Sequence, residues 1–400
     1  MNVQPRQTQR SSDGSAETRR LAVVSFTPGG RAQAERIGAL LQQPLGAVGW
    51  KMMHSHKPER LKEWCGHQFT EADAILFIGA MGIAVRTIAP FLQHKSKDPA
   101  VLVMDERAKH VISVLSGHLG GGNELTCQLA ERLSAEAVIT TASDVNHKLA
   151  IDVFAKKNGL YLTDFERAKQ VAAAIVAGRP VSFCSSETIC GMLPPELSAP
   201  PEAAEFEVVV TAKMDAEQKG SWSADGAAGA QTARPQSASL QETEHLTASE
   251  GARRLQRLVL VPPVFVLGIG CKKGTSAAAI ERAVEEELLA RRIYRQSIGA
   301  AATITLKREE AGLLEFCRAW KLPLTFYSAA ALREAPGMYE SSSFVQEITG
   351  VDNVCERAAV LKAQEGNPCV KTESCLVMPK TKKSGITLAL ARREWSVEFE

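Results

Sequence analysis

Three features are missing from this chain of 400 residues, and each absence excludes a class of protein. The chain has nine cysteines but no C-x-x-C pair, and the odd count predicts free thiols in a reducing compartment rather than a disulfide framework. Its longest apolar run, over residues 258–270, is interrupted by Pro262 and Pro263 and is too short to span a membrane. A net charge of only +2 argues against a nucleic-acid-binding protein.

A secretory signal is also missing. The six largely apolar residues at 21–26 end at the turn sequence Thr27-Pro28-Gly29-Gly30, so they are too few for the core of a signal peptide and fit a first strand better. We therefore expect a cytoplasmic protein with neither a membrane nor a nucleic acid as its partner.

What the chain does contain is a hydrophobic fraction of 45%, enough for packed cores, and a length that predicts two or three domains. Composition and pattern divide it as follows: a polar, disordered tail at residues 1–20, an N-terminal α/β domain at 21–158, a small middle region at 159–212, a flexible linker or insertion at 213–255 that has few large apolar residues, and a C-terminal α/β domain at 256–400.

In the N-terminal domain, short apolar segments alternate with helical segments, which predicts a doubly wound parallel sheet. The expected strands lie at residues 21–26, 74–78, 100–104, 111–115 and 137–140. Gly79, Asp105, Ser116 and Thr141 follow these strands, so we expect them to converge on one crevice at the carboxyl edge of the sheet. The same alternation in the last part of the chain predicts the separate C-terminal α/β domain.

Residues 110–125 are the stretch on which the chain's function is expected to depend. An apolar strand breaks at Ser116-Gly117-His118, and Asn123 is expected to cap the helix that follows. Free N–H groups and the positive end of a helix dipole at such a turn can bind an anion, and His118 adds a titratable group. The alternative is that the glycines only form a sharp turn. The glycines concerned are Gly120, Gly121 and Gly122.

Two further glycine-containing loops are candidates for binding a ligand. In the first, Gly79 and Gly82 allow close approach of a ligand and Arg86 can contact an anion, although an ordinary tight turn fits equally well. In the second, two lysines and a helix start predict an anion cradle, and the absence of any later histidine argues against a nucleophilic role for Cys271. Neither loop matches a complete dinucleotide or Walker A pattern. The residues of the second loop are Gly268, Gly270, Lys272, Lys273, Gly274 and Thr275.

Carboxylates and possible metal ligands complete the set of candidates. Asp105 is a candidate general base, and Glu124 is a second carboxylate in the first turn of a helix, where the dipole also favours it structurally. The alternate pairs His54/His56 and Cys65/His67 can each share one face of a strand, but no standard zinc spacing matches, so no metal site is predicted.

With these residues in view, the chain resembles the cobalt-precorrin-5A hydrolase family, also called CbiG, of anaerobic cobalamin biosynthesis. Three segments in this order carry the resemblance: FIGAMGIAVRTIAP at 77–90, VISVLSGHLGGGNELT with TTASDVN at 111–146, and LGIGCKKGTSAAAIERAV at 267–284. The second half also resembles a small stand-alone protein of the aerobic cobalamin route, which favours a separable C-terminal domain.

The resemblance implies a substrate and a reaction. The substrate is a cobalt-containing, methylated tetrapyrrole with a lactone between the ring A acetate and the C20 carbon. The family opens this lactone and releases C20 with its methyl group as acetaldehyde, giving cobalt-precorrin-5B. Water is consumed, no redox cofactor is implied, and the cobalt is carried by the substrate. Other cobalamin-pathway enzymes are expected partners.

Chemistry suggests roles that the resemblance does not assign. We predict that His118, with Asp105 or Glu124, transfers the proton, and that the backbone of the two glycine loops holds substrate carboxylates with help from Lys272 and Lys273. Two alternatives stay open: a tetrapyrrole carrier or scaffold without a catalytic base, and a nucleotide-binding enzyme of the Rossmann type.

Overall fold

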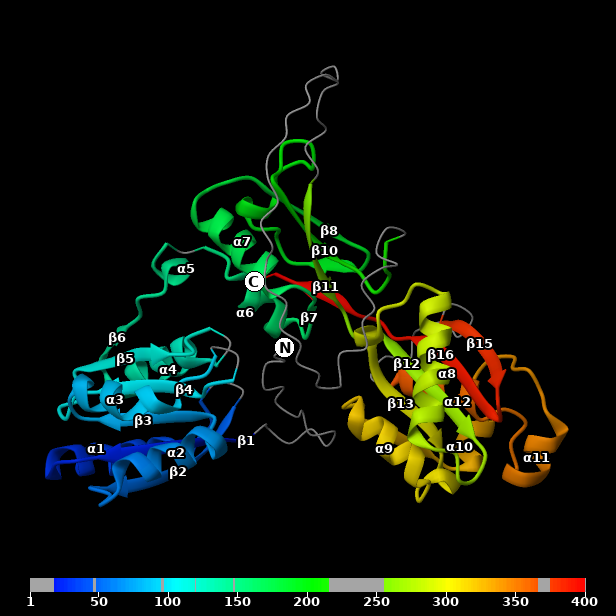
Figure 1. Cartoon of the computed structure of the whole chain (residues 1–400), viewed down its shortest axis with the longest axis horizontal. Helices are drawn as coiled ribbons and strands as arrows, with labels where there is room; N and C mark the ends of the chain where they lie inside the picture. Colours follow the sequence, from blue (N-terminus) through cyan, green and yellow to red (C-terminus); the bar gives the residue numbers. More distant parts are fainter. Residues whose placement is uncertain are drawn as a thin grey trace, which may run out of the picture. The chain divides into compact units, whose positions relative to one another are not determined.

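The computed structural model describes residues 18–45, 48–94, 97–118, 120–146, 148–215, 255–365 and 375–399 (Figure 1). The chain forms two compact units, which divide between Phe154 and Ala155, near the boundary predicted at residue 158. In the described part of the chain, no helix has the length and apolar character needed to cross a membrane. Most of the predicted tail and linker, residues 1–17 and 216–254, lie outside the described residues.

The N-terminal unit is built on a sheet of six strands in the order β2-β1-β3-β4-β5-β6. Strands β1, β2, β3 and β4 are mutually parallel, whereas β5 runs antiparallel to β4 and β6 runs parallel to β5. The strand bounds are β1 Thr18–Ser25, β2 Gly49–His56, β3 Ala74–Ile78, β4 Ala100–Met104, β5 His110–Leu115 and β6 Glu136–Val138.

Helices cover both faces of this sheet, as the doubly wound prediction requires. Alternate residues of each central strand point to opposite faces, so Leu76 packs with α1 and α4 while Phe77 packs with α2 and α3. The bounds of these helices are α1 Pro28–Leu40, α2 Leu61–Glu71, α3 Met81–Ile88 and α4 Gly122–Leu133, and a short 3-10 turn, η1, at Ala89–Phe91 follows α3. After β6 come α5 Ala142–Val145 and α6 Ile151–Lys157, and the division between the two units falls within α6.

The antiparallel direction of β5 shows that the prediction of one crevice shared by four strand ends is wrong. Gly79 and Asp105 follow β3 and β4 at one edge of the sheet. Ser116 and Thr141 follow β5 and β6, whose carboxyl ends lie at the opposite edge because these strands run the other way. The four residues therefore form two separate groups.

The second unit begins with the middle region, whose sheet has the order β7-β11-β10-β8. Strand β11 is parallel to β10, so residues 256–261 belong to this sheet rather than to the C-terminal domain predicted from residue 256. The elements are β7 Tyr161–Leu162, α7 Phe165–Val176, β8 Val181–Ser185, β9 Thr188–Cys190, η2 Pro195–Leu197, β10 Phe206–Val210 and β11 Gln256–Val261.

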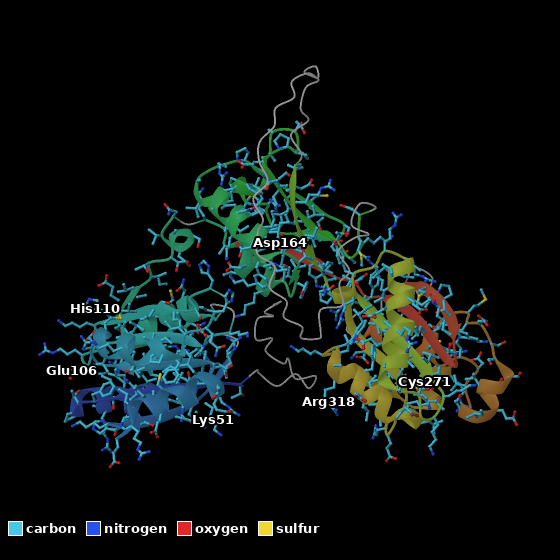
Figure 2. The ribbon with its side chains drawn as sticks, in the orientation of Figure 1. Lys51, Glu106, His110, Asp164, Cys271 and Arg318 are labelled. Carbon is cyan, nitrogen blue, oxygen red and sulfur yellow. The ribbon has the colours of Figure 1, made fainter. Side chains whose placement is uncertain are left out.

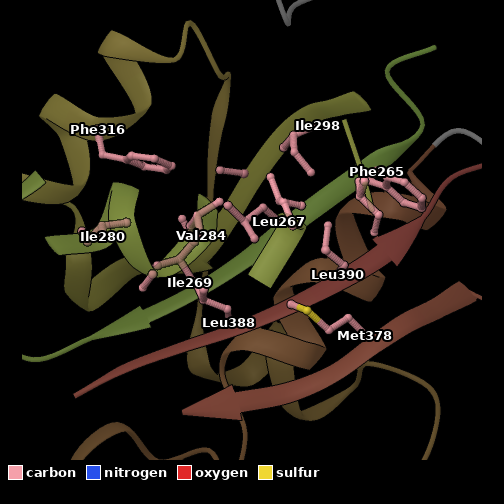
Figure 3. Close-up of a cluster of buried hydrophobic side chains, with 14 of the residues drawn as sticks. Phe265, Leu267, Ile269, Ile280, Val284, Ile298, Phe316, Met378, Leu388 and Leu390 are labelled. Atoms are coloured by element: carbon pink, nitrogen blue, oxygen red, sulfur yellow. The ribbon is translucent and has the colours of Figure 1, made fainter. Parts of the chain in front are cut away.

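The C-terminal sheet has the order β14-β13-β12-β16-β15, with β12, β13 and β14 parallel and β16 antiparallel to both neighbours. Helices α8 and α9 pack on one face of this sheet, and α12 packs on the other. Figure 3 shows side chains of β12, α8, α9 and β16 meeting in the first of these cores.

The strands of this part are β12 Phe265–Cys271, β13 Ile298–Ile304, β14 Leu324–Tyr327, β15 Leu376–Lys383, β16 Ile386–Arg392 and β17 Ser396–Glu398. The helices are α8 Ala277–Ala290, α9 Ala311–Ala319, α10 Ala329–Arg333, α11 Ser343–Thr349 and α12 Cys355–Gln364, and the 3-10 turns are η4 Arg295–Ser297 and η5 Thr305–Lys307. The last strand, β17, pairs with β9 of the middle region.

Candidate functional site

The turn between β5 and α4 is tightly packed. A Cβ atom at Gly117 would lie 2.4 Å from Oδ1 of Asn123, and one at Gly120 would lie 2.5 Å from the side chain of Ser116. Ser116 and Gly121 adopt positive φ values of 53° and 80°, so the chain reverses direction within a few residues. The turn itself thus requires these glycines.

Three backbone donors at the end of this turn already have partners. The N–H groups of Gly121, Gly122 and Asn123 donate to carbonyl oxygens of the preceding turn at 2.9–3.2 Å. Gly121 is the N-cap residue and Asn123 lies inside α4, so the predicted capping role of Asn123 is wrong. In this conformation the N–H groups of Gly121 and Gly122 do not form the carboxylate cradle that the sequence suggested.

His118 nevertheless stands at the centre of a polar cluster. Its Nε2 atom lies 2.7 Å from Oδ2 of Asp144, and its Nδ1 atom lies 3.4 Å from Oδ1 of Asp152. The hydroxyl of Ser143 lies 3.1 Å from the same Nε2 atom. Helices α5 and α6 supply these three partners, and the side chains of His118 and Asp152 are each 18% exposed while that of Asp144 is 38% exposed.

Asn123 orients the Asp144 carboxylate from a second side. Its Nδ2 atom donates to Oδ2 of Asp144 at 3.1 Å and to the hydroxyl of Thr141 at 2.9 Å. Asn123 is only 7% exposed, so burial and two hydrogen bonds hold its amide in place. One oxygen of Asp144 therefore lies close to both His118 and Asn123.

The neighbouring carboxylates set the protonation of His118. The hydrogen bond to Asp152 is the largest cause of a raised pKa, Asp144 raises the pKa further, and burial opposes both effects. An imidazolium whose two N–H groups both face carboxylates is a poor proton acceptor. Of the three side chains, that of Asp144 is the most exposed and is therefore the one a ligand can reach most readily.

Asp105 and Glu106 do not join this cluster. The carboxylate of Asp105 accepts hydrogen bonds from the backbone N–H groups of Arg107, Lys109 and His110 at 2.7–2.9 Å, which closes the turn between β4 and β5. Burial raises the pKa of Asp105, but these hydrogen bonds outweigh burial and hold the pKa below its usual value. The proposed pairing of Asp105 with His118 is thus excluded, because the two residues follow strands that end at opposite edges.

Glu106 and His110 lie together at the Asp105 edge (Figure 2). Glu106 accepts a hydrogen bond from the hydroxyl of Thr27 at 2.6 Å, and Thr27 in turn caps α1. Glu124 is exposed on α4 and accepts a hydrogen bond from Gln128 at 3.2 Å, one turn along its own helix, which fits the structural role considered for it.

The predicted loop at Gly79 and Gly82 also lies at the Asp105 edge. The Gly79 N–H group donates to the carbonyl oxygen of Met104 at 2.9 Å, and a Cβ atom at Gly79 would lie 3.0 Å from the ring of Phe26. A Cβ atom at Gly82, by contrast, would meet nothing within 4 Å. Packing accounts for Gly79, whereas Gly82 and the exposed Arg86 remain candidates for ligand contact.

Two glycines predicted for the second loop lie inside β12 instead. A Cβ atom at Gly268 would lie 1.9 Å from the carbonyl oxygen of Cys355 on α12, and one at Gly270 would lie 2.4 Å from the hydroxyl of Thr387 on β16. Close packing of the sheet explains both glycines, so neither glycine is evidence for a ligand-binding loop.

In the remaining part of that loop, one backbone N–H group donates to a carboxylate of the same chain. Gly274 has a φ of 78°, and its N–H group donates to Oε1 of Glu310 at 2.7 Å. The hydroxyl of Thr275 donates to the carbonyl oxygen of Lys272 at 2.8 Å and tightens the turn. Burial is the largest cause of the raised pKa of Cys271, which keeps this residue a neutral thiol, as expected for a residue without a catalytic role.

The two pairs of possible metal ligands lie on different elements. His54 and His56 lie on β2, and each has a ring nitrogen 2.9 Å from the hydroxyl of Ser25. Cys65 and His67 lie on helix α2, not on a strand, and Cys65 is buried in the core. Across the described residues, no group of three or more His, Cys, Asp or Glu side chains is placed to hold a metal ion.

Comparison with known proteins gives the chain a family. It matches the family regions described as Cobalamin synthesis G N-terminal at residues 63–144, Cobalamin biosynthesis central region at 149–220 and Cobalamin synthesis G C-terminus at 265–391. The His118 turn and Asp144 fall in the first region, Asp152 in the second, and the loop at Gly274 in the third.

Individual relatives extend these matches over most of the chain. A cobalt-precorrin-5A hydrolase from Priestia megaterium is 30% identical over 92% of this chain and 94% of its own length. A cobalt-precorrin-5A hydrolase from Salmonella typhimurium is 32% identical over 86% of this chain and 92% of its own length. Protein CobE from a Sinorhizobium species is 29% identical over 32% of this chain and 79% of its own length. The chain therefore belongs to the cobalt-precorrin-5A hydrolase family, whose members are also described as cobalamin synthesis G proteins.

Proposed function

We propose that this chain is a cobalt-precorrin-5A hydrolase of cobalamin biosynthesis. The observation that carries the proposal is the match, along 92% of the chain, to a relative that bears this name. The reaction opens the lactone between the ring A acetate and C20, and then releases C20 and its methyl group as acetaldehyde. Water is the co-reactant, and the cobalt ion belongs to the substrate.

The His118 cluster supplies the groups that lactone opening needs. Asp144 takes a proton from a water molecule as the water oxygen bonds to the lactone carbonyl carbon, and the bond from that carbon to the ring oxygen breaks. The proton then passes to the departing oxygen on C20, which gives an alcohol and a carboxylic acid, and the acid loses its remaining proton to solvent. Nε2 of His118, 2.7 Å from Asp144, and the Asn123 amide keep the carboxylate oriented throughout.

The same carboxylate serves the second step. Removal of the C20 hydroxyl proton allows a C=O bond to form as the bond between C20 and the macrocycle breaks. Acetaldehyde leaves, and the electron pair stays with the macrocycle, which takes up a proton. One base on one edge of the sheet is sufficient for both steps, because each begins with the removal of a proton from an O–H group.

Substrate carboxylates need cationic partners elsewhere. Arg86 is proposed for this role in the N-terminal unit. Lys272, Lys273 and the N–H group of Gly274 are proposed as a separate carboxylate-binding group in the C-terminal domain. We further propose a cytoplasmic location and transfer of the product to other cobalamin-pathway enzymes.

The test is acetaldehyde release from the cobalt-precorrin lactone, followed by a coupled alcohol dehydrogenase. Asp144→Asn should lower kcat by at least a hundredfold with little change in KM, since general base catalysis contributes about 10²–10⁴-fold. His118→Ala should lower kcat less, because it removes the positioning group and leaves the base. Lys272→Ala should raise KM instead.

His110→Ala is the matched control. His110 stands at the other end of β5, also near two carboxylates, Asp105 and Glu136, each at 3.5 Å. We expect its kcat to equal that of the unsubstituted chain. Unchanged acetaldehyde release by Asp144→Asn would remove this cluster from the mechanism, and tight lactone binding without any acetaldehyde would point to a carrier.

A further inference from the structure

The loop after β12 holds a carboxylate from its own chain. Oε1 of Glu310 accepts the Gly274 N–H group at 2.7 Å, and Oε2 of the same side chain lies 3.0 Å from Nζ of Lys307. Each carboxylate oxygen thus has its own donor, one from the backbone and one from an ammonium group. This is the pattern by which proteins bind a free carboxylate.

This contact lies at the edge of the C-terminal sheet where a ligand is expected to bind. Gly274 follows β12 and Lys307 follows β13, and these strands are parallel neighbours, so both donors lie at the carboxyl edge of the sheet. In open α/β sheets ligands bind at this edge. The Lys307 and Glu310 side chains are 18% and 9% exposed, so the ion pair is largely shielded from water rather than solvated.

The surrounding residues favour a carboxylate at this position. The pKa of Glu310 is held below its usual value, and the hydrogen bond to Lys307 is the largest cause. The hydrogen bond from the Gly274 N–H group and the positive charge of Lys273 lower this pKa further. Glu310 is the N-cap residue of α9, but its side chain does not cap that helix. Rotation of this side chain out of the loop therefore breaks no capping bond of its own helix.

We propose that Glu310 is an internal occupant of a carboxylate-binding site formed by Gly274, Lys273 and Lys307, and that a carboxylate side chain of the ligand displaces it. The identity of that ligand as a corrinoid carrying free acetates and propionates rests on the proposed function, whereas the site itself does not. With Glu310 in place the site is closed, so binding selects for ligands whose carboxylates can compete with it.

The affinity of such a site depends on how often it is open. When only a fraction of the molecules is open, the apparent Kd equals the intrinsic Kd divided by that fraction. If Glu310 occupies the site in about nine molecules of ten, its removal should tighten binding about tenfold. An occupant that forms two charge-assisted hydrogen bonds is strong enough for such a population.

The experiment measures binding by the full-length chain with two probes: a cobalt corrin bearing free acetate and propionate groups, and propane-1,2,3-tricarboxylate. Isothermal titration should give about tenfold tighter binding of both probes by Glu310→Ala, because its site is no longer occupied by Glu310 in about nine molecules of ten. Glu310→Gln should tighten binding less, because its amide oxygen still accepts from Gly274. Lys307→Met on the Glu310→Ala background should abolish the gain.

Glu166→Ala is the matched control, since it removes an acid from another i, i+3 pair with lysine, at 2.6 Å from Lys169, with the same change in net charge. It should leave both affinities unchanged, and thermal unfolding of every variant checks its folding. Equal affinities of the unsubstituted chain and Glu310→Ala would overturn the proposal. So would equal gains in Glu310→Ala and Glu166→Ala, which would indicate a general charge effect.

The two proposals fail in different ways. Acetaldehyde release with no affinity change in Glu310→Ala overturns the occupied site and leaves the hydrolase function intact. A tenfold gain in tricarboxylate binding without acetaldehyde release supports the site and overturns the hydrolase function.

Discussion

Replacement of His118 by glutamine should reduce the stability of the N-terminal unit in a way that depends on pH. Two carboxylates raise the pKa of His118 above its ordinary value of 6.5, so the imidazolium stabilises the fold. A raised pKa gives a stabilisation that is complete below pH 6.5 and disappears as the pH rises through the folded-state pKa. The difference in unfolding free energy between the two proteins should therefore be largest near pH 6 and smallest near pH 9.

The size of the effect follows from the contacts. His118 has one close ionic hydrogen bond at 2.7 Å and a longer one at 3.4 Å, in a side chain that is 18% exposed. Hydrogen bonds to charged groups contribute about 1.5–3 kcal/mol each in stability, and the burial of His118 offsets part of the gain from its two carboxylates, so we expect a loss of about 2 kcal/mol near pH 6. Removal of the cation also leaves Asp144 and Asp152 without the charge between them.

Urea unfolding followed by hydrogen exchange in peptides from α4 measures this difference locally, at several pH values between 5.5 and 9. His110→Gln is the control: its contacts are longer, at 3.5 Å, and its side chain is 47% exposed, so its loss should stay within about 0.5 kcal/mol at every pH. A loss for His118→Gln that is constant or grows with pH would contradict this prediction, because it would mean that the charge of His118 does not stabilise the folded protein.

Three further substitutions test the turns at the two edges of the N-terminal sheet. Gly117→Ala should destabilise the N-terminal unit by about 1–3 kcal/mol in urea unfolding, because its Cβ would lie 2.4 Å from Oδ1 of Asn123. Gly82→Ala should be neutral or slightly stabilising in the same measurement, because a Cβ atom there would meet nothing within 4 Å. Asp105→Ala should cost about 1 kcal/mol after allowance for its exposure, without a change in kcat. Since the pKa of Asp105 is lowered, its contribution should be present at neutral pH and be lost in acid, as the pH falls through the folded-state pKa.

Much of the fold was predictable because the central strands are buried on both faces. Strands β3 and β4 are continuous apolar runs, and their predicted bounds agree with the structure. Strand β2 lies at the edge of the sheet and has a mixed sequence, GWKMMHSH, with no continuous apolar signal, so both β2 and the helix after it were missed. Strand β1 begins at Thr18 rather than Leu21, since pairing with β2 extends it into a polar segment.

The direction of β5 was mispredicted although the sequence holds the relevant signal. Only residues 105–109 connect β4 to β5. A parallel pair needs a crossover of about a dozen or more residues, so this short connection permits only a hairpin. The alternation of strands and helices does not predict the direction of β5, because no helix separates β4 from β5.

The candidate site was predicted in part. The glycine-rich turn identified His118, since turn residues and a histidine are visible locally. Asp144, Ser143 and Asp152 were not predicted as partners of His118, because their approach to His118 depends on how α5 and α6 pack against the turn. Contacts between segments many residues apart have no local signal in one sequence.

The antiparallel direction of β5 also limits where on the N-terminal sheet a substrate can react. A ligand that touched both edges of the N-terminal sheet would have to extend along its strands, about 20 Å for six residues at roughly 3.3 Å each. The reacting carbon can therefore lie beside Asp144 or beside Gly82 and Arg86, but not beside both. Asp105 closes a hairpin with its carboxylate, while Asp144 is oriented by two side chains and remains partly exposed, so we expect proton transfer at the His118 edge. At the opposite edge, where a Cβ atom at Gly82 would meet nothing within 4 Å, we expect only binding.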